Sequence, residues 1–98
     1  MPNVLSWAEF PISAAHRGDD GAMHGHTWMV RAHWEYEGKS VVDLGTMLER
    51  VCRKFDHTVL PEHLRRAEDM AGYIGDLVGA VKVEIRRDAE RMGATWTA

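Results

Sequence analysis

The chain has little cysteine, and this scarcity excludes one common class of small protein. Among its 98 residues only Cys52 carries a thiol, so a disulfide framework of the kind that stabilises short secreted domains is excluded. The longest uncharged apolar runs are a few residues, far below the roughly 20 that span a bilayer as a helix. The N-terminal residues lack the basic and apolar regions of a signal peptide. We therefore expect a cytoplasmic protein that has no membrane partner.

Clustered positive charge is also missing. Lys and Arg total 12 against 15 Asp and Glu, which gives a net charge of −3. Nucleic-acid binding usually requires a basic surface, so we expect no nucleic-acid partner. The hydrophobic fraction of 45% and the charged fraction of 28% are ordinary for a folded domain, and we expect one domain over residues 1–98. Because so short a domain buries only about two thirds of its surface, association with copies of itself would complete the burial.

Apolar periodicity predicts four strands. Residues 4–10 suggest a first strand, which Pro11 would end. Residues 27–36 are the clearest strand, because every second side chain from Trp28 to Tyr36 is apolar. Residues 81–86 alternate in the same way, and residues 94–98 suggest a brief last strand.

Two helices are expected between these pairs of strands. Asp43 would cap a helix whose apolar stripe runs from Met47 to Phe55. Pro61 would open a second helical region, in which Gly72 and Gly75 lower the helix propensity but allow close packing on a sheet. The order ββααββ predicts an α+β fold, an antiparallel sheet with two helices on one face. Its open edges lead us to expect that subunits join their sheets.

Histidine is the one residue type in excess, with six in the chain. In His24-Gly25-His26 the two imidazoles would lie on one face of an extended chain, about 6.5–7 Å apart along the strand. With His16 at the matching strand end, three neutral imidazoles and an open fourth position would form a zinc site of catalytic type. Alternatively, these are surface or turn histidines. Their parity matches the core-facing Trp28, so the site lies either at the mouth of the core or beside a bulge near Gly25.

Other polar residues allow two interpretations each. The pair Asp56-His57 suits acid–base chemistry, or His57 complements the dipole at a helix end. Glu84 either pairs with Lys82 or Arg86, or accepts two N–H bonds from a guanidine-like ring edge. Glu68 is either a pocket acceptor or an exposed helical residue. We expect Cys52 to be a buried structural thiol, and His33 and His63 to be surface residues.

An ordered set of short motifs gives the chain a family resemblance. From about Phe10 to Trp96 the chain resembles the 6-pyruvoyl-tetrahydropterin synthase and 6-carboxy-tetrahydropterin synthase family. The matching pieces, in chain order, are Ser13–His16, Met23–His26, Val42–Leu44, Phe55–Leu60, Ala67–Asp69, Val83–Glu84 and Ala94–Trp96.

The resemblance implies the tunnelling fold, in which the sheets of several subunits close into a barrel, as trimer-based rings that reach a hexamer in some cases, with active sites at subunit interfaces. It implies zinc held by His16, His24 and His26, with Asp56 and His57 as two members of a catalytic triad. Glu84 would anchor a pterin ring, with Glu68 nearby. The implied chemistry is lyase chemistry on the side chain of 7,8-dihydroneopterin, its triphosphate or a related pterin.

The chain also departs from the family pattern. Where the family has its triad cysteine, four residues before His24, this chain has Asp20. Asp20 either replaces the thiolate as a carboxylate base or simply belongs to a turn. The sequence thus leaves two functions open: a zinc-dependent lyase, and a zinc- and pterin-binding homologue that has lost catalysis and acts as a binding or assembly module. Arg65 and Arg66 replace the family's Pro-Thr pair, and guanidinium groups at these positions suit a phosphate-bearing ligand.

Overall fold

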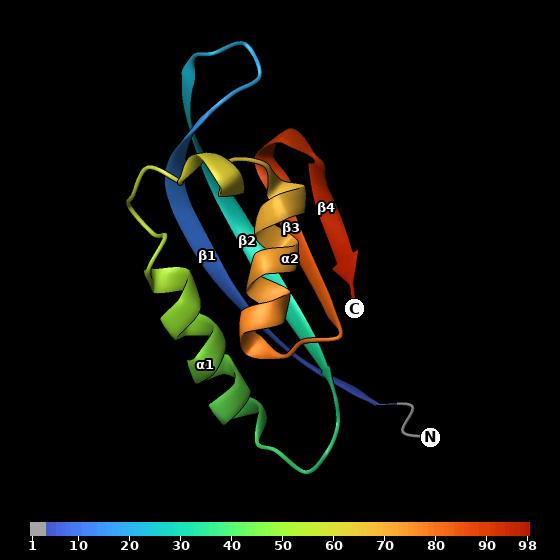
Figure 1. The fold of residues 1–98 in the computed structure, drawn as a ribbon. Helices are drawn as coiled ribbons and strands as arrows, with labels where there is room; N and C mark the ends of the chain where they lie inside the picture. Colours follow the sequence, from blue (N-terminus) through green and yellow to red (C-terminus); the bar gives the residue numbers. More distant parts are fainter. Residues whose placement is uncertain (1–3) are drawn as a thin grey trace.

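A computed structural model describes residues 4–98 as one four-stranded antiparallel sheet with two helices on one face (Figure 1). The strand order is β1-β2-β3-β4. In chain order the elements are β1 (Leu5–Arg17), β2 (Met23–Glu35), α1 (Val41–Arg53), the 3-10 turn η1 (Glu62–Leu64), α2 (Ala67–Val78), β3 (Lys82–Arg87), the 3-10 turn η2 (Asp88–Glu90) and β4 (Met92–Thr97). Residues 1–3, on which the signal-peptide expectation partly rests, lie outside the described residues. The predicted α+β order ββααββ is confirmed.

The first two strands form a longer hairpin than the sequence predicted. β1 does not end at Pro11 but runs on to Arg17, with Pro11 opposite Met29 in the ladder. Proline is tolerated here because β1 is an edge strand, where alternate N–H groups face away from the partner strand. β2 begins at Met23, four residues before the predicted start at Thr27. The His24-Gly25-His26 segment therefore lies inside a strand.

Both helices begin elsewhere than predicted. The Oγ of Ser40, not Asp43, caps α1 by accepting the Val42 N–H at 3.1 Å. Pro61 opens only the short turn η1, because the extended backbone of Arg66 (φ −99°, ψ 139°) interrupts the helix before α2 begins. α2 ends at Val78, and the residue that caps it, Gly79, has a φ of 66°, in the left-handed region that glycine adopts at low cost.

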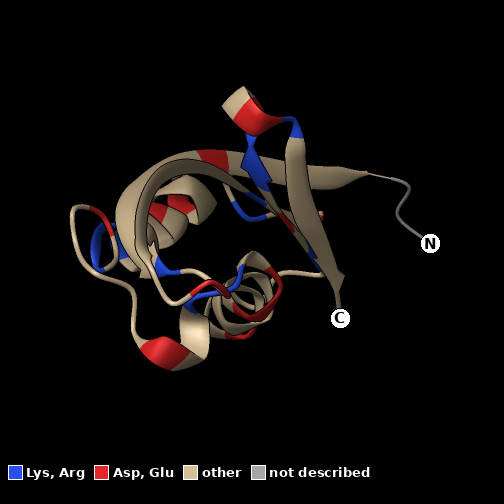
Figure 2. Cartoon of the chain, turned by 90° about the horizontal axis from the view of Figure 1, so that it is seen from above, with Lys and Arg blue, Asp and Glu red and all other residues tan. Residues whose placement is uncertain are grey.

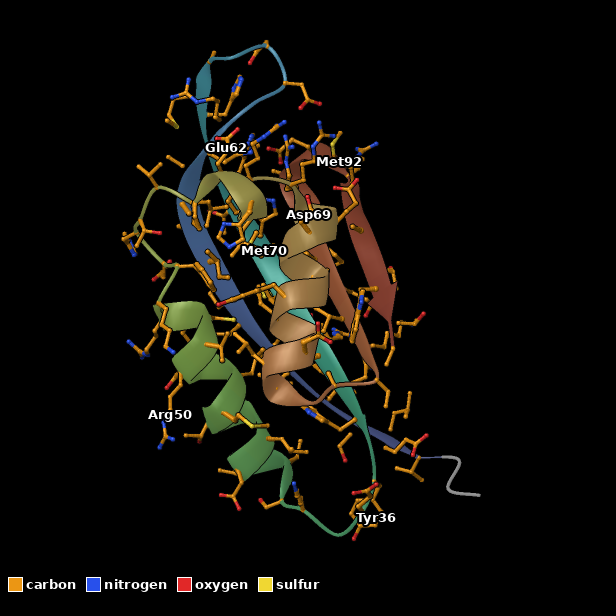
Figure 3. The ribbon with its side chains drawn as sticks, viewed as in Figure 1. Tyr36, Arg50, Glu62, Asp69, Met70 and Met92 are labelled. Atoms are coloured by element: carbon orange, nitrogen blue, oxygen red, sulfur yellow. The ribbon has the colours of Figure 1, made fainter. Side chains whose placement is uncertain are left out.

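The core lies between the sheet and the two helices. The predicted inward face of β2 is confirmed, since Trp28, Val30, Ala32 and Trp34 are buried. Tyr36, which the alternation placed on the same face, lies beyond the end of β2 and is 53% exposed (Figure 3). The other buried apolar residues are Ile12, Ala14, Leu44, Leu48, Val51, Cys52, Leu60, Leu64, Met70, Ala71, Ile74, Val78, Ala80, Val83 and Ile85.

The glycines of α2 allow the close approach that the sequence suggested. A Cβ added at Gly75 would lie 2.2 Å from the ring of Trp96 on β4, and one at Gly72 would lie 3.2 Å from it. Trp96 therefore packs directly on the helix backbone. In residues 4–98 no helix has the length and apolar character needed to cross a bilayer.

Candidate functional site

The histidines predicted from sequence line a cavity of about 460 Å³ at one end of the molecule. Here the hairpin loop between β1 and β2 approaches η1, the start of α2 and the start of β4; Glu62, Asp69 and Met92 mark this end in Figure 3. Figure 2, which views the molecule from above, shows acidic and basic segments interspersed. The lining residues are His16, Gly18, Asp19, Asp20, His24, His26, Trp28, Arg65, Arg66, Ala67, Glu68, Arg87, Met92 and Gly93.

Strand register brings the three histidines together. His16 on β1 is paired directly with His24 on β2, and His26 lies opposite Ala14. The ladder continues through Gly25, which pairs with Ala15, so no bulge resets the face. Of the two alternatives left open by the parity, the structure selects the mouth of the core. The rings of His16 and His26 both meet Trp28 edge-on, with centroids 5.3 and 5.4 Å from it.

His16 is oriented by a backbone group far away in sequence. Its Nδ1 lies 2.8 Å from the carbonyl oxygen of Arg65, which can only accept a hydrogen bond. The proton is therefore assigned to Nδ1, and Nε2 carries the free lone pair. That Nε2 is buried and has no hydrogen-bond partner within residues 4–98. A buried, unpaired acceptor is costly unless something binds it.

His26 and His24 both face carboxylates. The Nδ1 of His26 lies 3.1 Å from Oε1 of Glu90, which leaves its Nε2 available. Burial, together with the positive charge of Arg87, lowers the pKa of His26, so its ring tends to be neutral. The Nε2 of His24 instead lies 3.1 Å from both carboxylate oxygens of Asp20.

The arrangement can be tested for its fit to zinc. Three imidazoles on one tetrahedral zinc would place their ring centroids about 5 Å apart, given a Zn–N distance near 2.1 Å. The centroids of His16 and His26 are 5.0 Å apart, whereas His24 lies 6.0 and 6.1 Å from these two. Within residues 4–98 no group of three or more His, Cys, Asp or Glu side chains stands in metal-binding geometry. Three imidazoles are a donor set that suits zinc, and the distances from His24 to the other two rings are longer than such a site requires.

Asp20 and Glu68 lie at the same cavity as the histidines. Asp20 combines both interpretations made from sequence, because its Oδ1 accepts the Ala22 N–H at 2.9 Å within the turn and also contacts His24. These hydrogen bonds, the one from Ala22 first, lower the pKa of Asp20. Glu68 lies in the first turn of α2 and is exposed at the cavity rim.

Asp56 and His57 lie elsewhere. The Nδ1 of His57 is 2.9 Å from Oδ2 of Asp56, and the His57 side chain is 83% exposed. The Ser13 N–H donates to Oδ1 of Asp56 at 2.8 Å; this bond, aided by His57 and only partly offset by burial, lowers the pKa of Asp56. α1 ends at Arg53, so His57 does not belong to its last turn, and the helix-dipole interpretation is wrong. His57 borders a separate shallow hollow, which His26 also lines.

Glu84 lies on the sheet face opposite the cavity. Its Oε2 lies 2.9 Å from Nε2 of His33, a hydrogen bond that lowers the pKa of Glu84. Neither Lys82 nor Arg86, the partners expected from sequence, forms an ion pair with it. His33 was expected at the surface but is only 9% exposed. The β2–β3 register sets Arg31 opposite Glu84, which places His33 diagonally beside that carboxylate.

The single cysteine lies away from the cavity, in the core. Cys52 is buried in α1, as expected, and burial with the nearby Asp56 raises its pKa to about 12. Arg87, which lines the cavity, and Glu90, which contacts His26, were not predicted from the sequence. Arg87 shares the parity of the inward-facing Val83 and Ile85, a signal that could have placed it on the cavity side of β3.

These features define an α+β protein with a histidine-lined cavity at the end of an antiparallel sheet. A comparison with protein families matches residues 7–95 to the family described as 6-pyruvoyl tetrahydropterin synthase, and the chain belongs to this family. Among solved structures, the 6-pyruvoyl tetrahydropterin synthase of Caenorhabditis elegans is similar, with a TM-score of 0.70 and 18% sequence identity. The match covers 97% of this chain and 95% of that chain, and at this identity it shows the fold. No curated protein matches the chain.

Proposed function

We propose that the protein is a zinc-dependent lyase that acts on the side chain of a dihydropterin, such as 7,8-dihydroneopterin or its triphosphate. The observation that carries the metal assignment is the Nε2 of His16, buried and unpaired beside two further imidazoles. Membership of the 6-pyruvoyl tetrahydropterin synthase family supports the substrate class.

Three histidines would hold the metal, and one carboxylate would act as the base. His16, His24 and His26 would hold zinc, which when bound polarises oxygens of the substrate side chain and makes an adjacent C–H acidic. The Arg65 carbonyl fixes the ring of His16, and Glu90 fixes that of His26, so two of the three ligands are oriented by partners on Nδ1. Asp20 would be released from His24 when that ring turns, and it could then accept the substrate proton as a carboxylate base.

Asp56, His57 and Glu84 would act from a neighbouring subunit. None of them lines the histidine cavity of its own chain. The exposure of His57 leaves its Nε2 free to exchange a proton with a ligand held by another copy, while Asp56 holds the ring through Nδ1. Glu84, oriented by His33, would receive the ring edge of the pterin in the same way. The proposal therefore requires a homo-oligomer, either a trimer-based ring or a hexamer.

A second function, binding without catalysis, is favoured by the position of the cysteine. Cys52 lies in the core with a pKa of about 12, so it supplies no thiolate to the cavity. Without that base the chain could bind zinc and a pterin, and serve as a binding or assembly module. This alternative predicts pterin binding without turnover, and activity gained on Asp20→Cys.

The test combines metal analysis with substrate incubation. Purified protein loaded with zinc would be incubated with 7,8-dihydroneopterin and with its triphosphate, and products would be separated by chromatography. The lyase proposal expects about one zinc per chain, turnover of one compound, and loss of both on His16→Ala. Asp20→Asn would abolish turnover and retain zinc. Metal-loaded protein that neither binds nor alters either compound would refute both proposals, whereas binding without turnover would support the module.

A further inference from the structure

The carboxylate of Asp20 lies beside one of the imidazole nitrogens at the cavity. Both oxygens of Asp20 lie 3.1 Å from Nε2 of His24. This nitrogen is at the tip of its ring, as are the Nε2 atoms of His16 and His26, whose Nδ1 atoms are held by other groups. A metal ion that bound all three imidazoles through Nε2 would therefore meet Asp20 directly.

The loop between β1 and β2 holds Asp20 in this position. Its Oδ1 accepts the Ala22 N–H at 2.9 Å, and the Gly18 N–H closes the turn by donating to the Ala22 carbonyl at 2.8 Å. When a metal takes the place of the proton on Nε2 of His24, the hydrogen bond between His24 and Asp20 is lost. The hydrogen bond from Ala22 does not depend on that proton, so it keeps the carboxylate beside the metal.

A glycine lies directly beneath this pair of side chains. A Cβ added at Gly18 would lie 2.8 Å from Oδ1 of Asp20, and 2.7 and 2.9 Å from Cδ2 and Nε2 of His24. A side chain at position 18 would therefore push the carboxylate and the imidazole away from their present positions. The glycine allows both groups to lie in contact at the cavity wall.

The spacing of the pair is close to that of two ligands on one metal ion. Ligands about 2.1 Å from a tetrahedral zinc lie about 3.4 Å apart, and the nitrogen of His24 is 3.1 Å from each oxygen of Asp20. Carboxylate oxygens are common zinc ligands beside imidazoles. The neighbouring Asp19 is already engaged, because its Oδ1 lies 2.8 Å from Nη1 of Arg65 and 2.9 Å from Nη2 of Arg66. Asp20 is paired with no lysine or arginine within residues 4–98.

We propose that Asp20 is a fourth metal ligand, which closes the three-histidine site until a substrate displaces it. The site would then differ from the usual catalytic pattern, in which three protein ligands leave one position open. The inference rests on the proposed zinc site and deepens the proposed function. Asp20 serves first as a ligand, and it becomes available as the base only after a substrate has taken its position.

The first test measures the zinc affinity of the full chain by competition with a chromophoric chelator. Asp20→Asn should weaken zinc binding by at least about tenfold, because the loss of even a hydrogen-bonded partner of a ligand costs about 10- to 100-fold. Asp19→Asn is the matched control, since it removes the same charge from the same loop, and it should change the affinity much less. The three histidines still hold zinc in both variants, so their zinc content at full loading should stay near one per chain.

Cobalt in place of zinc tests direct contact between residue 20 and the metal. Cobalt-loaded Asp20→Cys should show the near-ultraviolet absorption band of a thiolate bound to cobalt. The cobalt-loaded wild type should lack this band, because Cys52 is buried in the core. Absence of the band at full cobalt loading, or equal zinc affinities of Asp20→Asn and Asp19→Asn, would overturn the assignment. Weaker zinc binding by Asp20→Asn without the band in Asp20→Cys would make Asp20 a hydrogen-bonding partner of His24, not a ligand.

Failure of the fourth ligand can be told apart from failure of the lyase proposal. Zinc affinity and the cobalt spectrum require no catalysis, whereas turnover is measured separately on wild-type protein. Turnover of a pterin by the wild type, with no cobalt band in Asp20→Cys, would support the lyase and refute the fourth ligand. The band without any turnover by the wild type would do the reverse, and a chain that binds neither zinc nor cobalt would refute both.

Discussion

Replacing Gly75 with alanine should destabilise the protein, although the same change usually stabilises a helix. In a helix interior, glycine to alanine is worth about 1 kcal/mol of added stability. Here the new Cβ would lie 2.2 Å from the Trp96 ring, whereas carbon atoms pack best at about 3.5–4.0 Å. The ring must then move by more than about 1 Å, which places the cost near the upper end of the range of about 1–3 kcal/mol for overpacking.

The net expectation is a loss of about 2 kcal/mol, or a fall in Tm of about 8–16 °C for a domain of this size. Thermal unfolding followed by far-ultraviolet circular dichroism, at one fixed protein concentration, would measure it. Gly45→Ala in α1 is the matched control, since its Cβ would meet only the Cβ of Ala8, at 3.6 Å. That variant should gain up to about 1 kcal/mol.

A double-mutant cycle with Trp96→Ala tests whether the clash with the Trp96 ring causes the predicted loss of stability. Once the ring is absent, Gly75→Ala should become stabilising by about 1 kcal/mol, so the coupling between the two positions is about 3 kcal/mol. The reasoning would be refuted if Gly75→Ala were as stable as wild type with the ring in place. It would also fail if the variant stayed equally destabilised after the ring is removed, because the clash would then not lie with Trp96.

Three further predictions concern the thiol, one acidic side chain and one helix cap. Cys52, buried and with a pKa of about 12, should resist iodoacetamide at pH 8 in native protein and react fully in urea; fast labelling of native protein would contradict its burial. Because the hydrogen bond from His33 lowers the pKa of Glu84 in the fold, the stability it contributes is present above the ordinary value near 4.5 and is lost as the pH falls below it. Urea unfolding between pH 7 and pH 3 should therefore show a smaller acid loss in Glu84→Gln than in wild type, while Glu35→Gln, at the exposed end of β2, should behave as wild type. Ser40→Ala removes the cap of α1 and should cost about 1 kcal/mol in the same assay, and an unchanged midpoint would show that the cap adds nothing.

Local pattern predicted the layers of the fold but not the lengths of its elements. Alternation placed Trp28 and Val30 inside, because successive side chains of a strand face opposite sides. The same logic failed at Tyr36, since alternation carries no information about where pairing stops. Pro11 predicts a strand end, but an edge strand tolerates proline, and whether β1 lies at an edge depends on the order of all four strands.

Only part of the candidate site could be predicted, because sequence patterns report local neighbours and not contacts between distant elements. His16, His24 and His26 could be grouped from sequence because a short hairpin sets them side by side. Asp20 and Glu68 also reach the cavity, whereas Asp56, His57 and Glu84 do not reach it within one chain. The burial of His33 was not predicted, because its hydrogen-bond partner, Glu84, lies on β3, far along the sequence.

Local sequence patterns were enough to predict the faces of the strands, the apolar stripes of the helices and the approach of three histidines across one hairpin, since each depends on a period or a turn of a few residues. Three contacts could be found only in the folded chain: the Arg65 carbonyl orients His16, Asp19 lies between two arginines, and Arg87 shares their cavity. Each of these contacts joins elements far apart in the chain. Their formation depends on strand register and helix docking together, and a slip of one residue in register would turn each side chain to the other face.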